Sequence, residues 1–147
     1  MDTRPDITVQ NRDGQPVGMI DLERGARLTS RGVGQIYRSY LNAGSLRGVR
    51  YFLVITPDRV CVWILNGKKH RDDRPNHMAI NTALPRFLKD RMGKPLDRHI
   101  MLLATYEWLI HLADYDPDPA DPAELALANS GFIEVLKDAH FSFEPAA

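Results

Sequence analysis

Three carboxylates near the N-terminus could lie close together and form a metal site. Asp21 and Glu23 are two positions apart, so on a strand their side chains would share one face. Asp6 begins the preceding apolar segment and would lie nearby if the two segments pair. Such close like charges repel unless a cation binds or one carboxyl holds a proton. Hard divalent cations such as Mg²⁺ take oxygen ligands of this kind, whereas the alternative is an ordinary solvent-exposed acidic strand.

A β-hairpin over residues 4–24 is the element that must position these carboxylates. Apolar residues alternate with polar ones in both halves of this segment, which is typical of half-buried strands. Gly14 closes an Asn-Arg-Asp-Gly run that predicts the turn, because glycine can adopt a positive φ angle. On the returning strand, Asp21 and Glu23 would face one side and the intervening apolar residues the other.

The segments after the hairpin predict an α/β order of elements. Residues 31–42 carry apolar side chains at helical spacing, and Thr29 or Ser30 could cap that helix. Residues 50–56 and 60–65 are continuous apolar runs, typical of strands buried on both faces. The expected order of strand, strand, helix, strand, strand indicates an α/β fold.

This ordered series resembles the PD-(D/E)xK nuclease superfamily, whose fold is called restriction-endonuclease-like. The resemblance covers residues 4–66 and is carried by Pro5-Asp6, Ile20-Asp21-Leu22-Glu23 and Gln35-Ile36-Tyr37-Arg38-Ser39-Tyr40. It implies a mixed sheet flanked by helices, here with extra C-terminal helices. Two departures stand out: Glu23 occupies the position of the motif Lys, and only four residues precede Pro5, where the family usually has a helix.

The resemblance implies a nuclease that uses Mg²⁺ or Mn²⁺ to hydrolyse phosphodiester bonds in DNA. Asp6 and Asp21 would be the metal ligands, and Glu23 would orient or deprotonate the attacking water. Gln35 would point at the sheet edge and hold a water or a phosphate, or it is a plain surface amide. Two other readings stay open. One is an inactive nuclease-fold subunit that binds nucleic acid or a protein partner, and the other is a structural domain matched by chance.

The formal net charge of zero hides an asymmetry along the chain. Residues 1–75 contain 13 Lys and Arg against 8 Asp and Glu, whereas residues 76–147 contain 6 against 11. A modestly basic surface around carboxylates suits a phosphate backbone, although it also suits a plain solvated surface. The candidate contacts to nucleic acid are Arg24, Arg27, Arg31, Lys68 and Lys69.

The second half of the chain predicts further helices. A polar loop over residues 68–77 precedes a helical pattern over 78–92, which Pro85 interrupts, so that a short helix is expected over 85–92. Residues 97–113 are apolar on nearly all sides, and such a helix must be buried. It would lie in the core or mediate a homo-oligomer or larger complex.

The C-terminal segment predicts a linker and a last helix. Residues 114–122 are rich in Asp and Pro, which favours an extended, solvated connection. A helix is expected over 123–138. We therefore expect an α/β domain over residues 1–113 and a segment over 114–147 that packs on this domain or on a partner.

The bulk composition is that of a globular protein of one domain. The chain has 147 residues, of which 44% are hydrophobic and 26% charged. Cys61 is the single cysteine, so no intrachain disulfide forms, which fits a reducing, cytoplasmic location. A polar N-terminus argues against a signal peptide, and no apolar run reaches the length of a membrane span.

Overall fold

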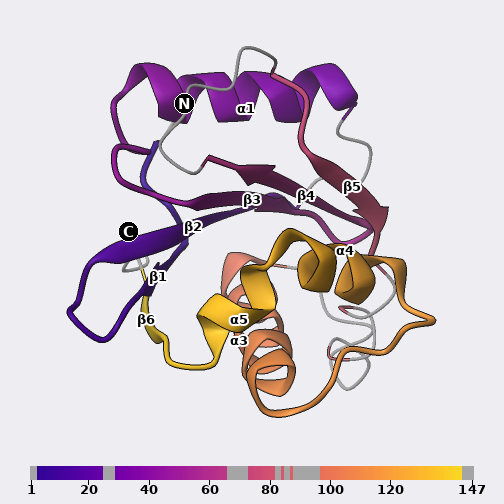
Figure 1. Ribbon diagram of the computed structural model, residues 1–147. Coiled ribbons are helices and arrows are strands. Elements are labelled where there is room, and N and C mark those ends of the chain that lie inside the picture. The colour runs from indigo at the N-terminus through magenta and orange to yellow at the C-terminus, as the bar shows by residue number, and fades with distance from the viewer. Residues whose placement is uncertain are drawn as a thin grey trace.

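The computed structural model describes residues 3–24, 29–65, 73–81, 84, 87 and 97–143. Within them, a mixed sheet lies between two helical layers (Figure 1). One face carries α1 (Ser30–Asn42), and the other carries α3 (Arg98–Asp114), α4 (Pro122–Ser130) and α5 (Phe132–Leu136). The expected α/β class is confirmed.

The sheet has six strands in the order β5-β4-β3-β2-β1-β6. β2 and β3 are parallel, which the crossover through α1 allows, and all other neighbours are antiparallel. The strands are β1 (Ile7–Gln10), β2 (Pro16–Leu22), β3 (Tyr51–Ile55), β4 (Arg59–Ile64), β5 (His77–Ile80) and β6 (His140–Phe143).

The N-terminal hairpin, helix and strand pair lie where the sequence predicts them. β1 and β2 pair in antiparallel fashion around a turn in which Gly14 has φ 81°. The Asn11 Oδ1 atom accepts hydrogen bonds from the backbone N–H groups of Asp13 and Gln15, which fixes that turn. Thr29 caps α1 by accepting from the Gly32 N–H at 3.0 Å.

Alternating residues of the strands divide the core into two layers. Ile20 and Leu22 pack in the layer covered by α3, α4 and α5, whereas Met19 packs in the layer covered by α1. Under α1, the Tyr37 ring stacks on Trp63 with ring centroids 5.1 Å apart. The predicted opposition of the two faces of β2 is confirmed.

The apolar helix expected over residues 97–113 is present as α3, with Asp97 as its N-cap. Met101, Trp108 and Leu112 are fully buried in the layer opposite α1, while Leu103 is 37% exposed. No helix in the described part of the chain is both long and apolar enough to span a membrane.

The prediction of a helical pattern beginning at residue 78 is wrong at its start. Residues 77–80 form β5, an edge strand paired with β4. Along it, half-buried His77 and Ala79 alternate with exposed Met78 and Ile80. Four residues are too few for this period to stand out against a helical one. Most of the helix expected over 85–92 lies outside the described residues.

The single helix expected over residues 123–138 is also wrong. It is divided into α4 and α5 at Gly131, whose φ of 86° ends α4 in the left-handed region. The strand β6 was not predicted, and it pairs with β1. Ala123, Leu127 and Phe132 belong to the same core layer as the sheet, so the C-terminal segment packs on the chain itself.

Candidate functional site

The pairing of β1 with β2 brings Asp6 beside Asp21. Ile7 pairs with Ile20, so the next position in register places Asp6 opposite Asp21. The Asp6 N–H continues the ladder by donating to the Ile20 carbonyl at 2.9 Å. The Asp6 Oδ2 atom accepts from the Leu22 N–H at 2.7 Å, which holds its carboxylate against the end of β2.

Asp21 is a buried carboxyl that, among the described residues, accepts a hydrogen bond at Oδ2. Its side chain faces α1, where the Tyr40 hydroxyl lies 2.6 Å from Oδ2 and 3.0 Å from the Arg4 carbonyl. Asp21 is 7% exposed, and among the described residues no hydrogen-bond donor reaches its Oδ1 atom. A buried acceptor without a donor is costly, so this oxygen points to a ligand, a proton or both.

The environment of Asp21 favours its neutral form. Burial, a hydrogen bond with the Glu23 carboxyl and the charges of Glu23 and Asp6 raise the pKa of Asp21 to about 8, and the Tyr40 hydroxyl opposes this rise. A carboxyl–carboxyl hydrogen bond requires a proton on one partner. At neutral pH, Asp21 therefore keeps its proton unless a cation replaces it.

Arg98 supplies a cation next to the carboxylates. It lies in the first turn of α3, and its Nε atom donates to Asp6 Oδ1 at 2.8 Å. Arg98 is not among the site residues that the sequence predicts. Asp97 signals the start of the helix, but no local pattern links position 98 to position 6, because the contact is made across the fold.

The donor set suits a cation that needs few protein ligands. Glu23 follows β2, and its N–H donates to the Ile55 carbonyl, so it stays beside the sheet end. No group of three or more His, Cys, Asp or Glu residues in the described ranges could hold a metal. Mg²⁺, however, often uses only one or two carboxylates with water and phosphate. Asp6 and Asp21, with its unsatisfied Oδ1, fit that requirement.

Gln35 lies on the exposed side of α1 and lines a cavity of about 420 Å³ together with Arg31, Arg38 and Arg74. Asp21 and Glu23 are not among the described residues that line this cavity. Arg24 is exposed directly after Glu23. The other candidate contacts to nucleic acid, Arg27, Lys68 and Lys69, lie outside the described residues.

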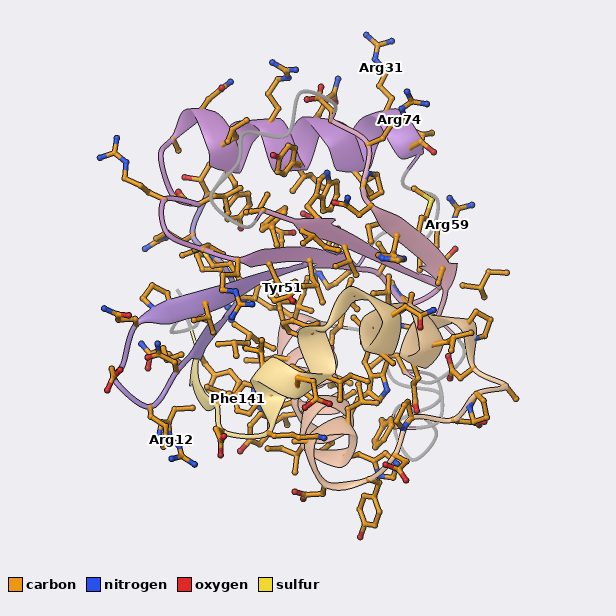
Figure 2. All side chains as sticks on the ribbon, in the orientation of Figure 1. Arg12, Arg31, Tyr51, Arg59, Arg74 and Phe141 are labelled. Atoms are coloured by element: carbon orange, nitrogen blue, oxygen red, sulfur yellow. The ribbon has the colours of Figure 1, made fainter. Side chains whose placement is uncertain are left out.

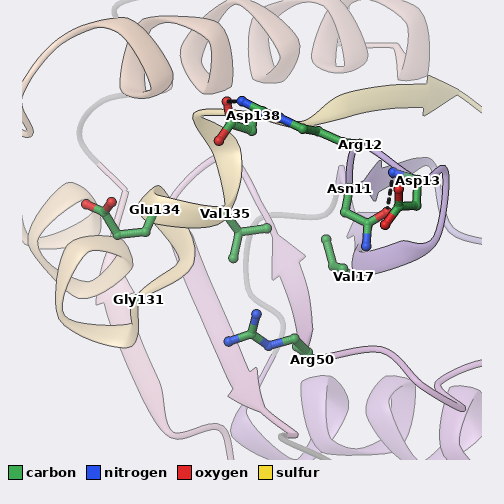
Figure 3. Close-up of a pocket in the computed structure, with 9 residues that line it drawn as sticks. All are labelled: Asn11, Arg12, Asp13, Val17, Arg50, Gly131, Glu134, Val135 and Asp138. Carbon is green, nitrogen blue, oxygen red and sulfur yellow. Dashed lines mark hydrogen bonds and ion pairs between the residues drawn. The ribbon is translucent and has the colours of Figure 1, made fainter.

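A second cavity, of about 570 Å³, lies between the hairpin turn and α5 (Figure 3). Arg12 and Asp138 join its two sides through an ion pair of 2.9 Å, with both side chains largely exposed. Exposed pairs of this kind contribute little to stability. Asp6, Asp21 and Glu23 are not among its described lining residues. These are Asn11, Arg12, Asp13, Val17, Arg50, Gly131, Glu134, Val135 and Asp138.

Comparison with known proteins adds no relative to these observations. No protein-family model matches the chain, and neither curated proteins nor solved structures give a significant match.

Proposed function

We propose that this chain is a divalent-cation-dependent nuclease that hydrolyses phosphodiester bonds in DNA. The observation that carries the proposal is Asp21: a buried carboxyl beside Asp6 and Glu23, with an oxygen that no described donor reaches. A cation at this point would satisfy that oxygen and relieve the repulsion among the three carboxylates.

Each carboxylate has a distinct part in the proposed reaction. Asp6 and Asp21 would hold Mg²⁺ or Mn²⁺, and Asp21 would release its proton as the cation binds. The bound ion would lower the pKa of a water molecule and offset the charge that develops on the scissile phosphate. Glu23, the more exposed partner of Asp21, would accept the proton from the attacking water.

The order of elements supports a restriction-endonuclease-like arrangement. The hairpin β1–β2 is followed by α1 and then by the strand pair β3–β4, which is the order that the motifs imply. Tyr40 of the helix motif reaches back to Asp21 of the strand motif, so two motifs that are distant in sequence meet at one site.

A second candidate is a nuclease-fold subunit without chemistry that binds nucleic acid or a protein partner. Arg98 favours it, because its guanidinium already neutralises Asp6 in an ion pair of 2.8 Å. The replacement of the motif Lys by Glu23 points the same way. In this case, the internal cation would stand in for the metal, and Asp21 would keep its proton at neutral pH.

The test is cleavage of plasmid and single-stranded DNA with Mg²⁺ or Mn²⁺, comparing the wild type with Asp21→Asn. We expect the variant to lose cleavage by at least about 100-fold, because asparagine keeps the shape of the side chain but lacks the charge that holds the ion. Asp13→Asn is the matched control, since Asp13 is exposed in the turn of the same hairpin, and it should cleave normally.

Calorimetric titration with Mn²⁺ separates the two candidates. The nuclease should bind Mn²⁺ with release of a proton near pH 7, and Asp21→Asn should weaken binding and abolish the release. Folded wild-type protein that neither binds Mn²⁺ nor cleaves DNA would refute the nuclease and leave the second candidate.

A further inference from the structure

The cavity beside α1 is a recess whose described lining contains three arginines. It is lined by Ser30, Arg31, Gly34, Gln35, Arg38, Asp73 and Arg74, which come from the N-terminal half of α1 and from the segment before β5. Figure 2 shows Arg31 and Arg74 at this end of α1, with their side chains projecting outward from the ribbon. Among its described lining residues, three are arginines and one, Asp73, is acidic.

Asp73 anchors this recess and is itself neutralised. Arg38 donates to both of its carboxylate oxygens, at 3.0 and 2.7 Å, and the Trp63 indole N–H donates to its carbonyl at 3.0 Å. A Cβ atom on Gly34 would lie 3.2 Å from the Asp73 Cβ, so the glycine permits the close approach of the two segments. Arg38 and Asp73 therefore pair with each other, and Arg31 and Arg74 are the other two arginines of the described lining.

The register of the sheet places another arginine at the same end of the sheet as Glu23. Asp21, Val54, Cys61 and Met78 are in register across four strands, and Val54 and Cys61 pack under α1. This row therefore faces α1. Side chains alternate along a strand, so the row two positions further toward the end of β2 also faces α1.

That second row contains Glu23 and Arg59. The Glu23 N–H donates to the Ile55 carbonyl, and Thr56 donates to the Arg59 carbonyl, so the two residues flank β3 at the same end of the sheet. With neighbouring strands about 4.8 Å apart, their backbones are about 10 Å apart. Arg59 is exposed, and its Nη1 atom lies 3.8 Å from the Met78 sulfur of the edge strand β5.

We propose that the phosphodiester backbone of the nucleic acid runs from the carboxylates past Arg59 and along β5 to the recess of Arg31, Arg38 and Arg74. This inference rests on the proposed function and names the contacts that hold the substrate strand. Arginine pairs well with phosphate oxygens, and a chain of phosphates needs several cations on one face rather than a single deep pocket. We call these four arginines the basic track.

The test measures binding of labelled single-stranded and duplex oligonucleotides in EDTA. Fluorescence anisotropy reports the affinity over a range of NaCl concentrations. The double variant Arg31→Gln/Arg74→Gln and the single variant Arg59→Gln should bind more weakly than the wild type. Each lost contact should reduce the slope of log affinity against log salt by about 0.7 to 0.9. Arg12→Gln is the matched control, because Arg12 lies on the hairpin turn, away from the basic track (Figure 2).

A variant with the opposite expected effect keeps the test independent of folding defects. Asp73→Asn removes the acidic side chain that pairs with Arg38 and releases that arginine, so it should bind the oligonucleotide more tightly than the wild type. Thermal unfolding of each variant shows that the protein is folded.

Several results would overturn the basic track. One is equal affinity and salt slope for the basic-track variants and Arg12→Gln, and another is no binding by the wild type. Displacement of the oligonucleotide by inorganic phosphate at matched ionic strength would instead identify a site for free phosphate. If hydrolysis depends on Asp21 but the basic-track variants bind as the wild type does, the nuclease stands and the basic track is refuted. If binding depends on the basic track but no hydrolysis occurs, the basic track stands and the nuclease is refuted.

Discussion

Asp21 is the residue on which the proposed function depends, and the burial of its carboxyl has an energetic cost. A buried carboxyl beside two other carboxyls is stabilised only by a proton, a cation or strong donors. Tyr40 supplies one donor, at 2.6 Å, and a proton shared with Glu23 can bridge the two carboxyls, while no other donor among the described residues reaches Oδ1. Such a group weakens the fold whenever it must ionise, which is characteristic of sites kept for chemistry rather than for stability.

The raised pKa of Asp21 predicts a dependence of stability on pH. Because the folded pKa is about 8 and an ordinary Asp titrates near 4, the folded protein keeps a proton that the unfolded chain has released between these values. The free energy of unfolding should therefore fall as pH rises from about 5 to 8, by up to about 1.4 kcal/mol per pH unit.

The measurement is urea unfolding of the wild type and Asp21→Asn at pH 5, 6, 7 and 8. The difference between the two free energies of unfolding isolates Asp21, since all other groups titrate in both proteins. The stability of Asp21→Asn relative to the wild type should increase at each higher pH. At pH 8, Mg²⁺ should reduce this difference in the free energy of unfolding if it binds the ionised group. Parallel pH profiles for the two proteins would contradict the raised pKa.

At the scale of elements, Gly131 decides how the C-terminal segment turns onto the sheet. Its φ of 86° ends α4, and a Cβ atom there would lie 2.9 Å from the Tyr51 hydroxyl. That hydroxyl donates to the Ser130 carbonyl at 3.1 Å, which ties the α4–α5 junction to β3. The junction is thus fixed both by backbone conformation and by a contact with a distant strand.

Gly131→Ala should destabilise the protein by about 2 kcal/mol or more, because the left-handed conformation alone costs about 1 to 2 kcal/mol for alanine and the contact with Tyr51 adds to it. Gly14→Ala is the matched control, since Gly14 has φ 81° but open space around its Cβ position. Thermal unfolding should show the larger loss at Gly131, and Tyr51→Phe should recover part of it in the double variant. Equal losses at the two glycines would exclude a steric contribution from Tyr51.

The elements that the sequence predicts well are those whose signals are local. The β1–β2 hairpin follows from alternation and a glycine turn, and α1 and α3 follow from apolar periodicity with a capping residue. The strands β5 and β6 were missed because each has four residues and is defined by its neighbour in the sheet. Arg98 was missed for the same reason, since its contact with Asp6 spans 92 positions of sequence.

At the scale of the whole molecule, one sheet supports two hydrophobic layers. Every second residue of the central strands packs under α1 and the others pack under α3, α4 and α5. The layers therefore share the same backbone, and neither can lose its strands without exposing the other. This coupling argues for a single cooperative folding unit, although the C-terminal segment begins with a Pro-rich acidic stretch.

The two tryptophans allow that cooperativity to be measured layer by layer. Trp63 is buried under α1, and Trp108 is buried in the opposite layer, where its indole N–H donates to Glu124 at 3.0 Å. In Trp108→Phe the fluorescence of Trp63 reports the layer under α1. In Trp63→Phe the fluorescence of Trp108 reports the layer under α3, α4 and α5. Within each variant, urea unfolding followed by fluorescence and by far-UV circular dichroism should give one midpoint, because coincident transitions mark two-state unfolding. The Trp108 signal could instead change at a lower urea concentration than the circular dichroism. In that case α3, α4 and α5 form a separate unit that leaves the sheet first. Asp6 would then lose its ion pair with Arg98 before the rest of the fold unfolds.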